Sequence, residues 1–233
     1  VWFENNGQRQ FIPYGDDDDG PWLGFQADRR ILQQIFQEKA IHCQANLINK
    51  AHPEQVIVEN NRVMGVIANG EMYRAKWTLD ASGRHAWLAD QLYLSKNLCS
   101  PRLSVKFGWR KEKSDTGFEK QPSFSFHQRG WSWQAPIGEN QLAWSELLIG
   151  DASVGKNHSP GIDVTWSIRT RCAGAGYFLL GDAAAMLDPS SSHGVLRAIM
   201  SGIMAGHLIV GSMRGEIPEN NAIELYQTWL TEI

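Results

Sequence analysis

The residues best suited to chemistry lie in one segment, 177–202, in which an apolar run is followed by a turn and a long apolar stretch. Asp182 follows Gly181 at the end of this predicted strand. Because α/β folds place ligands at the carboxyl ends of their strands, the Asp182 carboxylate is positioned to accept hydrogen bonds from sugar or polyol hydroxyl groups. A helix is predicted to begin near Gly194, and its free N–H groups and dipole suit an anion or an electron-rich ring edge.

Small residues let a large flat ligand approach the backbone of this segment: Ala183, Ala184, Ala185, Gly194, Ala198 and Gly202. On physical grounds alone, a structural turn and a buried helix explain the segment equally well. His193, next to the predicted helix start, is a candidate acid/base or substrate-orienting group, with a hydrogen-bonded turn histidine as the alternative. The other histidines and the three cysteines show no ligand spacing, so no metal site is predicted.

The predicted elements form two α/β segments that bracket a β-rich one. A helix is predicted from Asp28, a plausible N-cap, because apolar residues follow at helical spacing. Strands are predicted over 41–51 and on both sides of Asn69-Gly70, a strong hairpin signal, and another strand over 76–80 leads into a turn. Residues 1–27 are expected to be irregular, with the four aspartates at 16–19 forming a solvated loop.

The β-rich segment is predicted to be an antiparallel sheet with one covered face, because Leu103, Val105, Phe107 and Trp109 alternate along one strand. Trp131 and Trp133 alternate along another strand, which indicates either core packing or the wall of an aromatic pocket. We expect one α/β domain, α+β overall, made of residues 1–90 and 174–233. It is interrupted by an antiparallel domain at 91–173, with which residues 1–27 could be shared.

Composition excludes several classes of protein. The chain has 233 residues, 42% of them hydrophobic and 20% charged, which is ordinary globular composition and excludes disorder and coiled coil. A net charge of -3 gives no basic field for nucleic acid or a membrane surface. The apolar stretch 195–213 contains Arg197 and His207 and is predicted to be a buried helix rather than a membrane span. Scattered cysteines and the absence of a signal peptide predict a cytoplasmic protein.

Three segments, in order, resemble motifs of the FAD-dependent aromatic monooxygenases and their flavin-dependent halogenase relatives. They are FQADRRILQQIFQEKA at 25–40, AKWTLDASGRHAWLA at 75–89 and GDAAAMLDPSSSHGVLRAIMSG at 181–202. A fourth, GWSWQAP at 130–136, resembles the W-x-W-x-I-P segment of the halogenases, with Ala135 where isoleucine is usual. The resemblance implies a Rossmann-like FAD-binding domain interrupted by a β-sheet substrate domain.

The resemblance also implies roles for single residues. Asp182 and the adjacent Ala183 would lie along the ribityl chain or pyrophosphate of FAD. Arg29 would approach the same region, with a solvated arginine at the start of the helix as the alternative. The isoalloxazine ring would be lined by Pro189, Gly194 and Val195. The turn with Asp80 and Ser82 would lie near the cofactor, and Trp131 and Trp133 would border the substrate pocket.

Two departures from the family pattern limit these expectations. Halogenases carry Ser-Ser-Gly or Ser-Thr-Gly where this chain has Ser192-His193-Gly194. The G-x-G-x-x-G fingerprint that binds the ADP half of FAD is missing, because Gly174-Ala175-Gly176 is followed by a predicted strand. By analogy, we expect that fingerprint and the halogenase lysine upstream of Val1, and more chain beyond Ile233, so that these residues are an internal piece of a longer enzyme.

The function implied is hydroxylation of an aromatic substrate through a flavin C4a-hydroperoxide. The substrate would be indole- or phenol-like, or a peptidyl tryptophan. A flavin-dependent halogenase is the first alternative. A prenyl-lipid reductase of the same fold and a non-catalytic module without FAD are further ones. Electrons would come from NAD(P)H directly or from a separate flavin reductase, and neither nucleic acid nor a membrane is an expected partner.

Overall fold

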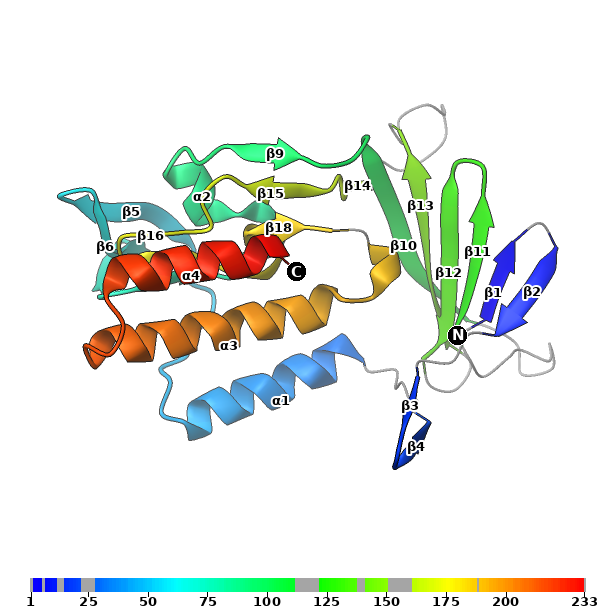
Figure 1. Cartoon of the computed structure of the whole chain (residues 1–233), viewed down its shortest axis with the longest axis horizontal. Helices are drawn as coiled ribbons and strands as arrows, with labels where there is room; N and C mark the ends of the chain where they lie inside the picture. The colour runs from blue at the N-terminus through cyan, green and yellow to red at the C-terminus, as the bar shows by residue number, and fades with distance from the viewer. Residues whose placement is uncertain are drawn as a thin grey trace. The chain divides into compact units, whose positions relative to one another are not determined.

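The computed structural model describes residues 2–5, 7–11, 15–21, 28–111, 122–137, 141–150, 161–187 and 189–232. The chain divides into two compact units, which are described separately. The first unit comprises Val1–Ile48 and Arg102–Asp163, and the second comprises Asn49–Pro101 and Val164–Ile233. The mixed α/β class with antiparallel sheets is confirmed (Figure 1). The units divide the chain at other positions than the predicted domains, and the assignment of cofactor and substrate domains stays a prediction.

A seven-stranded sheet forms most of the first unit, in the order β14-β10-β13-β12-β11-β1-β2. Only the β1–β11 pair is parallel. The strands are β1 (Trp2–Asn5), β2 (Gln8–Phe11), β10 (Leu103–Lys111), β11 (Ser123–His127), β12 (Gly130–Pro136), β13 (Gln141–Ile149) and β14 (Ile162–Asp163). β3 (Asp16–Asp17) and β4 (Gly20–Pro21) form a hairpin in the aspartate run. The expectation of irregular structure is therefore wrong for the described parts of 1–27, because β1 pairs with β11, a partner far along the chain that no local pattern reveals.

Aromatic and aliphatic side chains alternate with small polar ones along these strands, so the two faces of the sheet differ. Trp131, Phe124 and Leu147 are buried, and the Trp131 and Phe124 rings lie 5.2 Å apart between centroids. The prediction that one face of the sheet is covered is confirmed only at the start of β10. Further along that strand Phe107 is 54% exposed and Trp109 is 65% exposed. One end of the apolar face is therefore uncovered within the described residues.

The helix α1 (Arg29–His42) begins as predicted, because the Asp28 side chain accepts a hydrogen bond of 2.8 Å from the Arg30 N–H. No strand follows it, which corrects the strand predicted over 41–51. The helix continues to His42, and Gln44 then adopts a positive φ of 65°, a left-handed conformation that terminates helices. Lys50, with φ of 59°, interrupts any extended path before the next strand.

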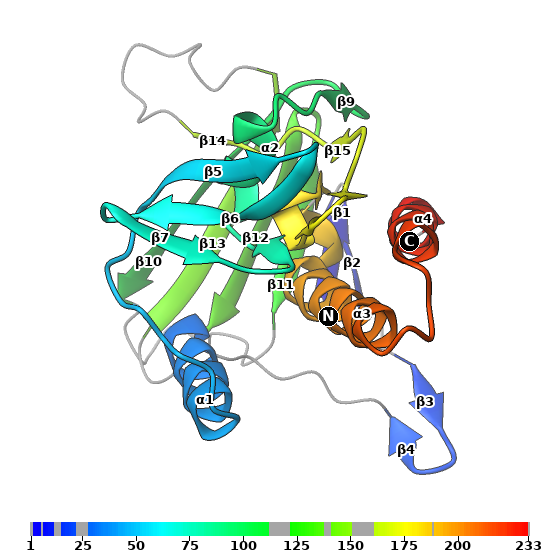
Figure 2. The same ribbon diagram turned by 90° about the vertical axis from the view of Figure 1, so that its left-hand side faces the viewer.

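In the second unit, β5 (Pro53–Glu59), β6 (Arg62–Ala68) and β7 (Glu71–Arg74) form an antiparallel sheet, which Figure 2 shows as three adjacent strands. The Asn69-Gly70 hairpin is confirmed, with φ of 53° and 76°. Asn60 and Asn61 make the preceding turn in the same way, with φ of 50° and 60°. Positive φ at both central residues is the type I′ geometry, whose twist matches that of the flanking strands.

A second small sheet has the order β16-β17-β8, formed by β16 (Ala173–Gly174), β17 (Tyr177–Leu179) and β8 (Thr78–Asp80). β17 and β8 are parallel, with Leu179 opposite Asp80, and the Leu180 N–H donates to the Asp80 carbonyl at 2.8 Å. A third sheet, β18-β15-β9, consists of β18 (Ala185–Met186), β15 (Ser167–Arg169) and β9 (Lys96–Leu98). In the sheet β16-β17-β8, the strands β8 and β17 therefore end at the same edge although they are far apart in sequence.

The core of the second unit is built around β17 and the helix α4 (Glu219–Glu232). The Tyr226 ring meets the Phe178 ring edge-on at 4.9 Å, and its hydroxyl donates to the Leu179 carbonyl at 2.6 Å. Burial raises the pKa of Tyr226 and raises that of the neighbouring Cys172 thiol to about 11. Such aromatic pairs contribute about 0.5–1.5 kcal/mol beyond the area that they bury. α4 thus fixes the strand that leads into the predicted site.

The helix α3 (Gly194–Met213) is buried along one stripe only, at Ser201, Ala205, Leu208 and Gly211. Its length and composition would allow it to cross a membrane, and 22% of its apolar 18-residue stretch is buried. The prediction of a buried helix is therefore wrong for most of its surface, since apolar side chains such as Leu196 and Ile203 are more than half exposed. Helical spacing places apolar residues on more than one face here, and only one face has packing partners among the described residues.

The turn at Gly176 provides a test of this fold. Gly176 has φ of 77°, and a Cβ there would overlap the carbonyl oxygen of Val63. We expect Gly176→Ala to lower the free energy of unfolding by more than about 3 kcal/mol. The backbone at Val63 would have to move, and alanine at position 176 would also have to adopt a strained φ. Gly70→Ala is the matched control, with φ of 76° and open space around its Cβ, and should cost only about 1 kcal/mol. Equal losses in urea unfolding would contradict this account.

Candidate functional site

The candidate site is the edge at which β8 and β17 end together. The turns that follow them are η1 (Gly83–His85) and η2 (Gly181–Ala183), and they lie in contact. Since the pairing is parallel, Asp80 and Asp182 both come at the carboxyl ends of strands, where α/β sheets bind ligands. The structure therefore brings together two of the predicted segments, 75–89 and 181–202.

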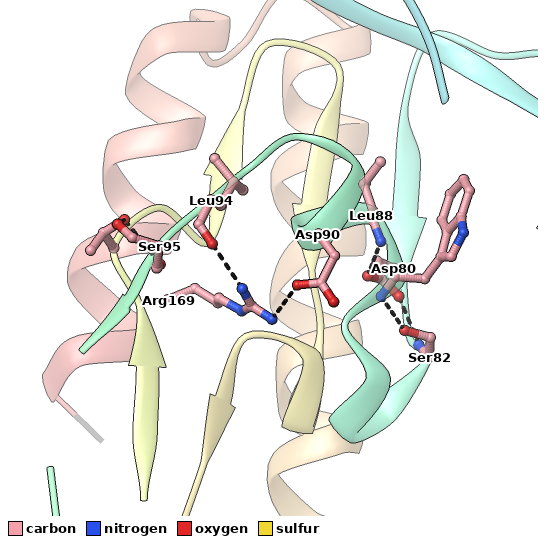
Figure 3. A network of polar contacts seen from close by, with 9 residues as sticks. Asp80, Ser82, Leu88, Asp90, Leu94, Ser95 and Arg169 are labelled. Atoms are coloured by element: carbon pink, nitrogen blue, oxygen red, sulfur yellow. Dashed lines mark hydrogen bonds and ion pairs between the residues drawn. The ribbon is translucent and has the colours of Figure 1, made fainter. Parts of the chain in front are cut away.

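Asp80 is 6% exposed, and both of its carboxylate oxygens are engaged within its own turn (Figure 3). One oxygen accepts from the Ser82 N–H at 2.8 Å and the other from the Leu88 N–H at 2.9 Å. The Ser82 hydroxyl in turn accepts from the Trp87 N–H at 2.9 Å. These bonds satisfy the free N–H groups at the start of α2 (Trp87–Gln91). In this structure Asp80 and Ser82 shape the turn, and cofactor contact by either stays a prediction.

Arg169 was not singled out by sequence, yet it ties α2 to the neighbouring strands. Its guanidinium donates to the Leu94 carbonyl at 2.8 Å and to the Asp90 carboxylate at 2.9 Å (Figure 3). The Arg169 side chain is 13% exposed, whereas that of Asp90 is 65% exposed. Nothing in the local pattern around Arg169 distinguishes it from a surface arginine, because its partners come from a distant part of the chain.

η2 is held tightly on α3. The Gly181 N–H donates to the Ser201 hydroxyl at 2.9 Å, and that hydroxyl donates to the Ala198 carbonyl at 3.0 Å. Gly181 has φ of 53°, and a Cβ there would lie 3.2 Å from the Ala198 Cβ. Ala183 is 1% exposed and belongs to the hydrophobic core. Asp182, which lies between Gly181 and Ala183, is exposed. The turn therefore presents the carboxylate of Asp182 outward from a fixed backbone.

The helix α3 begins eleven residues after this turn, beyond β18 and η3, and its N-cap side chain makes no capping hydrogen bond. His193 is the N-cap residue, is exposed, and makes no capping hydrogen bond with its imidazole. Gly194 is exposed, with nothing within 4 Å of a built Cβ, and Val195 is half-buried. Pro189 is exposed in the short helix η3 (Pro189–Ser191). The N–H groups of the first turn have no partners within the helix and thus favour a negatively charged group.

Arg197 is a second residue that sequence reasoning gave no role. Its Nε is buried without a hydrogen-bond partner among the described residues, and its terminal nitrogen lies 3.4 Å from the Ala185 carbonyl oxygen. Desolvation lowers the pKa of Arg197, and the negative charge of Asp182 opposes that shift. Asp182 and Arg197 therefore interact electrostatically across η2 and α3. The signal available in sequence was a charged residue within an otherwise apolar run.

Three predicted site residues belong to the first unit. Arg29 is exposed at the start of α1. Trp131 is 5% exposed, and its indole Nε1 is buried with no hydrogen-bond partner among the described residues. Trp133 is half-buried on the same strand. Their predicted roles toward the cofactor and substrate stay predictions. Across the described residues, no group of three or more metal-ligating side chains gathers.

The Asp80 turn can be tested by a single-atom exchange. We expect Asp80→Asn to lower the free energy of unfolding by about 2 kcal/mol. An amide has one acceptor oxygen, whereas the Ser82 and Leu88 N–H groups need one oxygen each. Asp90→Asn is the matched control, since the Asp90 side chain is 65% exposed and its ion pair with Arg169 should contribute about 0–1 kcal/mol. Urea unfolding of both variants checks this, and a loss at Asp80 no larger than at Asp90 would refute the assignment.

No family model matches the chain. Among curated proteins, the tryptophan 2-halogenase of Chondromyces crocatus is 38% identical over 187 residues, which is 65% of this chain and 36% of that protein. Digeranylgeranylglycerophospholipid reductase 2 of Methanopyrus kandleri is 22% identical, over 93% of this chain and 63% of that protein. The chain thus spans between about a third and two thirds of the length of these curated relatives.

Solved structures agree with these matches. The flavin-dependent brominase Bmp2 superposes with a TM-score of 0.81 and 18% identity, over 98% of this chain and 65% of that one. The peptidyl tryptophan dihydroxylase QhpG superposes with a TM-score of 0.73 and 16% identity, over 100% of this chain and 57% of that one. At these identities the superpositions establish the fold. Together with the ordered sequence motifs and the curated relatives, they show that the chain is similar to flavin-dependent halogenases and FAD-dependent monooxygenases.

Proposed function

We propose that this chain contributes to an FAD-dependent oxidoreductase that hydroxylates an aromatic substrate. The observation that carries the proposal is the edge at which η1 and η2 are in contact and η2 packs on α3. It offers an outward carboxylate at Asp182 and an uncapped helix N-terminus at Gly194. Several curated relatives and solved structures are named as flavin-dependent or FAD-dependent enzymes, which supports the same cofactor here.

The residues present fit FAD. Asp182 would accept hydrogen bonds from the ribityl hydroxyl groups, since its carboxylate is exposed on a turn fixed by Gly181 and Ser201. A flat ring can approach the backbone at Gly194, because nothing lies within 4 Å of a Cβ there. Pro189 and Val195 would complete that surface. When bound, FAD would supply the redox chemistry with oxygen.

The protein's contribution is electrostatic and positional. The N–H groups at the start of α3 stabilise negative charge on a ring edge placed against them, an effect of about 0.3–1 kcal/mol at exposed sites and more when water is excluded. Arg197 adds a positive charge one turn along the same helix, and Asp182 partly neutralises it. The balance of these two charges sets the field at the ring edge, so both residues are positioning groups rather than proton carriers.

His193 is the candidate for acid/base chemistry. Its imidazole is exposed and is not used to cap α3, so a substrate bound at the helix start can receive a hydrogen bond or exchange a proton with it. Halogenation is the second candidate, favoured by the GWSWQAP segment on β12 and by the halogenases among the relatives. A lipid reductase, favoured by the Methanopyrus relatives, would need no oxygen.

FAD binding gives the first test. The full-length natural protein should purify with flavin absorbance at about 450 nm or take up added FAD. Asp182→Asn should weaken FAD binding about tenfold, equivalent to about 1.4 kcal/mol, because a charged acceptor is lost. Glu216→Gln, an exposed change just beyond the far end of α3, is the control and should leave FAD affinity unchanged. A colourless protein that cannot be reconstituted would overturn the proposal.

Product analysis gives the second test. With reduced flavin, oxygen and an indole or phenol substrate, we expect a hydroxylated product in the absence of chloride and bromide. His193→Ser should lower kcat about 10²-fold, the typical contribution of an acid/base group, with the bound flavin unchanged. His207→Ser, exposed further along α3, is the control. Products formed only with halide would shift the assignment to halogenation, and unchanged kinetics would remove His193 from the mechanism.

A further inference from the structure

The seven-stranded sheet of the first unit carries a hollow that the proposed function does not use. Its volume is about 280 Å³, and it lies on the face of the sheet opposite to that of Trp131. It is lined by residues of four strands, β10, β11, β12 and β13, all within one unit. Ser125, Ser132, Trp144 and Glu146 are among the lining residues.

Three oxygen-bearing side chains form one row across this hollow. Ser125 on β11 stands opposite Ser132 on β12, which in turn stands opposite Glu146 on β13. Residues directly opposite each other on antiparallel strands have Cβ atoms about 4.5–5.5 Å apart, so one atom placed between the two hydroxyl groups can contact both. The longer Glu146 side chain can reach the same point. The row therefore gathers two hydroxyl groups and a carboxylate around one position.

These acceptors are not used within the described part of the protein. Ser125, Ser132 and Glu146 are half-buried, and none of them has a hydrogen-bond or ion-pair partner among the described residues. Lys106 stands opposite Glu146 on β10, yet the two form no ion pair. Glu4 on β1 continues the row beyond Ser125, so a carboxylate stands at each end of the serine pair. An unpaired carboxylate that is partly removed from water favours a positively charged ligand.

An aromatic ring borders the row. Trp144 precedes Glu146 by two residues on β13, and it therefore lies on the same face, about 7 Å away along the strand. Gly108, opposite Trp144 on β10, makes room for the indole, whose atoms would lie 3.0–3.1 Å from a Cβ at that position. Arg110 lies at the far end of the hollow, about 13 Å along β10 from the row of Glu146, and donates to Gln134. The hollow is thus acidic at one end and aromatic in the middle.

We propose that this hollow binds a primary ammonium group that a short chain joins to an aromatic ring. A primary ammonium has three N–H donors and no acceptor, which matches the three acceptor side chains of the row. The bond to the Glu146 carboxylate is charge-assisted, and the ring lies against Trp144.

The size of the hollow agrees with such a ligand. The spacing of about 7 Å between the two rows matches a two-carbon chain plus one ring. The volume is just below the lower end of ordinary ligand pockets, about 300–1,000 Å³, and therefore suits a small ligand. The inference goes beyond the proposed function and is independent of flavin, because every contact comes from the first unit.

Calorimetry of the whole chain with phenethylamine at neutral pH tests this site, and we expect saturable one-to-one binding. Phenethyl alcohol, in which a hydroxyl replaces the ammonium, should bind at least about tenfold more weakly, because it forms no charge-assisted bond to Glu146. The trimethylammonium derivative keeps the positive charge but has no N–H group. It should also bind at least about tenfold more weakly, because the row of acceptors then receives no hydrogen bond.

Substitutions at the row should change the affinity for phenethylamine in defined directions. Glu146→Gln removes the charge at constant size and should weaken binding about tenfold or more. Ser132→Val, a change that β-strands tolerate, removes the central hydroxyl and fills the hollow, and it should weaken binding by a similar factor. Lys106→Gln removes a positive charge beside Glu146. Binding should then be at least as tight as in the parent chain, whereas a site for an anion would lose affinity.

Glu38→Gln is the matched control, since it removes the same charge from an exposed position on α1 of the same unit. It should leave the affinity within about twofold of the parent chain, because salt screens exposed charges. Thermal melts of all variants establish that each is folded.

The proposal is overturned if phenethylamine does not bind saturably or if either analogue binds equally well. It is also overturned if folded Glu146→Gln and Ser132→Val variants bind like the parent, if Lys106→Gln weakens binding, or if Glu38→Gln weakens it as much as Glu146→Gln. Absence of flavin in the sample affects none of these outcomes.

Discussion

The parallel pairing of β8 with β17 is the constraint on which the candidate site depends. Asp80 and Leu179 face each other across this pair although about a hundred residues separate them, and closing such a loop costs conformational entropy. Burial of Phe178, Leu179 and Tyr226 offsets that cost, and the Tyr226 hydroxyl binds the last carbonyl of β17. Without the pair, the two turns would each be an ordinary loop. With it, Asp80 orders one turn and Gly181 the other at a shared edge.

Much of the local structure could be predicted from sequence because its causes are local. Asn69-Gly70 specifies its turn through positive φ, and Asp28 specifies a helix start through one hydrogen bond. Pairing partners distant in sequence could not be predicted. β1 is a strand because β11 lies beside it, and 41–51 is not a strand because Gln44 and Lys50 leave the extended region. The partial exposure of α3 could not be predicted either, since it depends on what packs against each face.

The residues of the candidate site also divide into those that local sequence patterns reveal and those that depend on distant partners. Asp182 and Gly194 could be found from their positions after a strand and at a helix start, which are readable patterns. Arg169 and Arg197 could not, because a buried guanidinium is recognised only by partners from other elements. On the sheet, the tryptophans of β12 indicate the apolar face. The serine that alternates with them lies on the opposite face, beside a serine of β11, and such small residues give no signal until two strands are placed side by side.

The small sheet β16-β17-β8 ends at β8, and among the described residues no strand pairs with its outer side. β8 contains neither proline nor a charged residue before Asp80, and Leu79 is 43% exposed. Proteins usually protect such an edge, because its unpaired N–H and C=O groups are a template for another chain. Sheet extension is therefore available to this chain. A further strand laid along β8 would lengthen the sheet by backbone hydrogen bonds alone, and would leave the turns at Asp80 and Asp182 as they are.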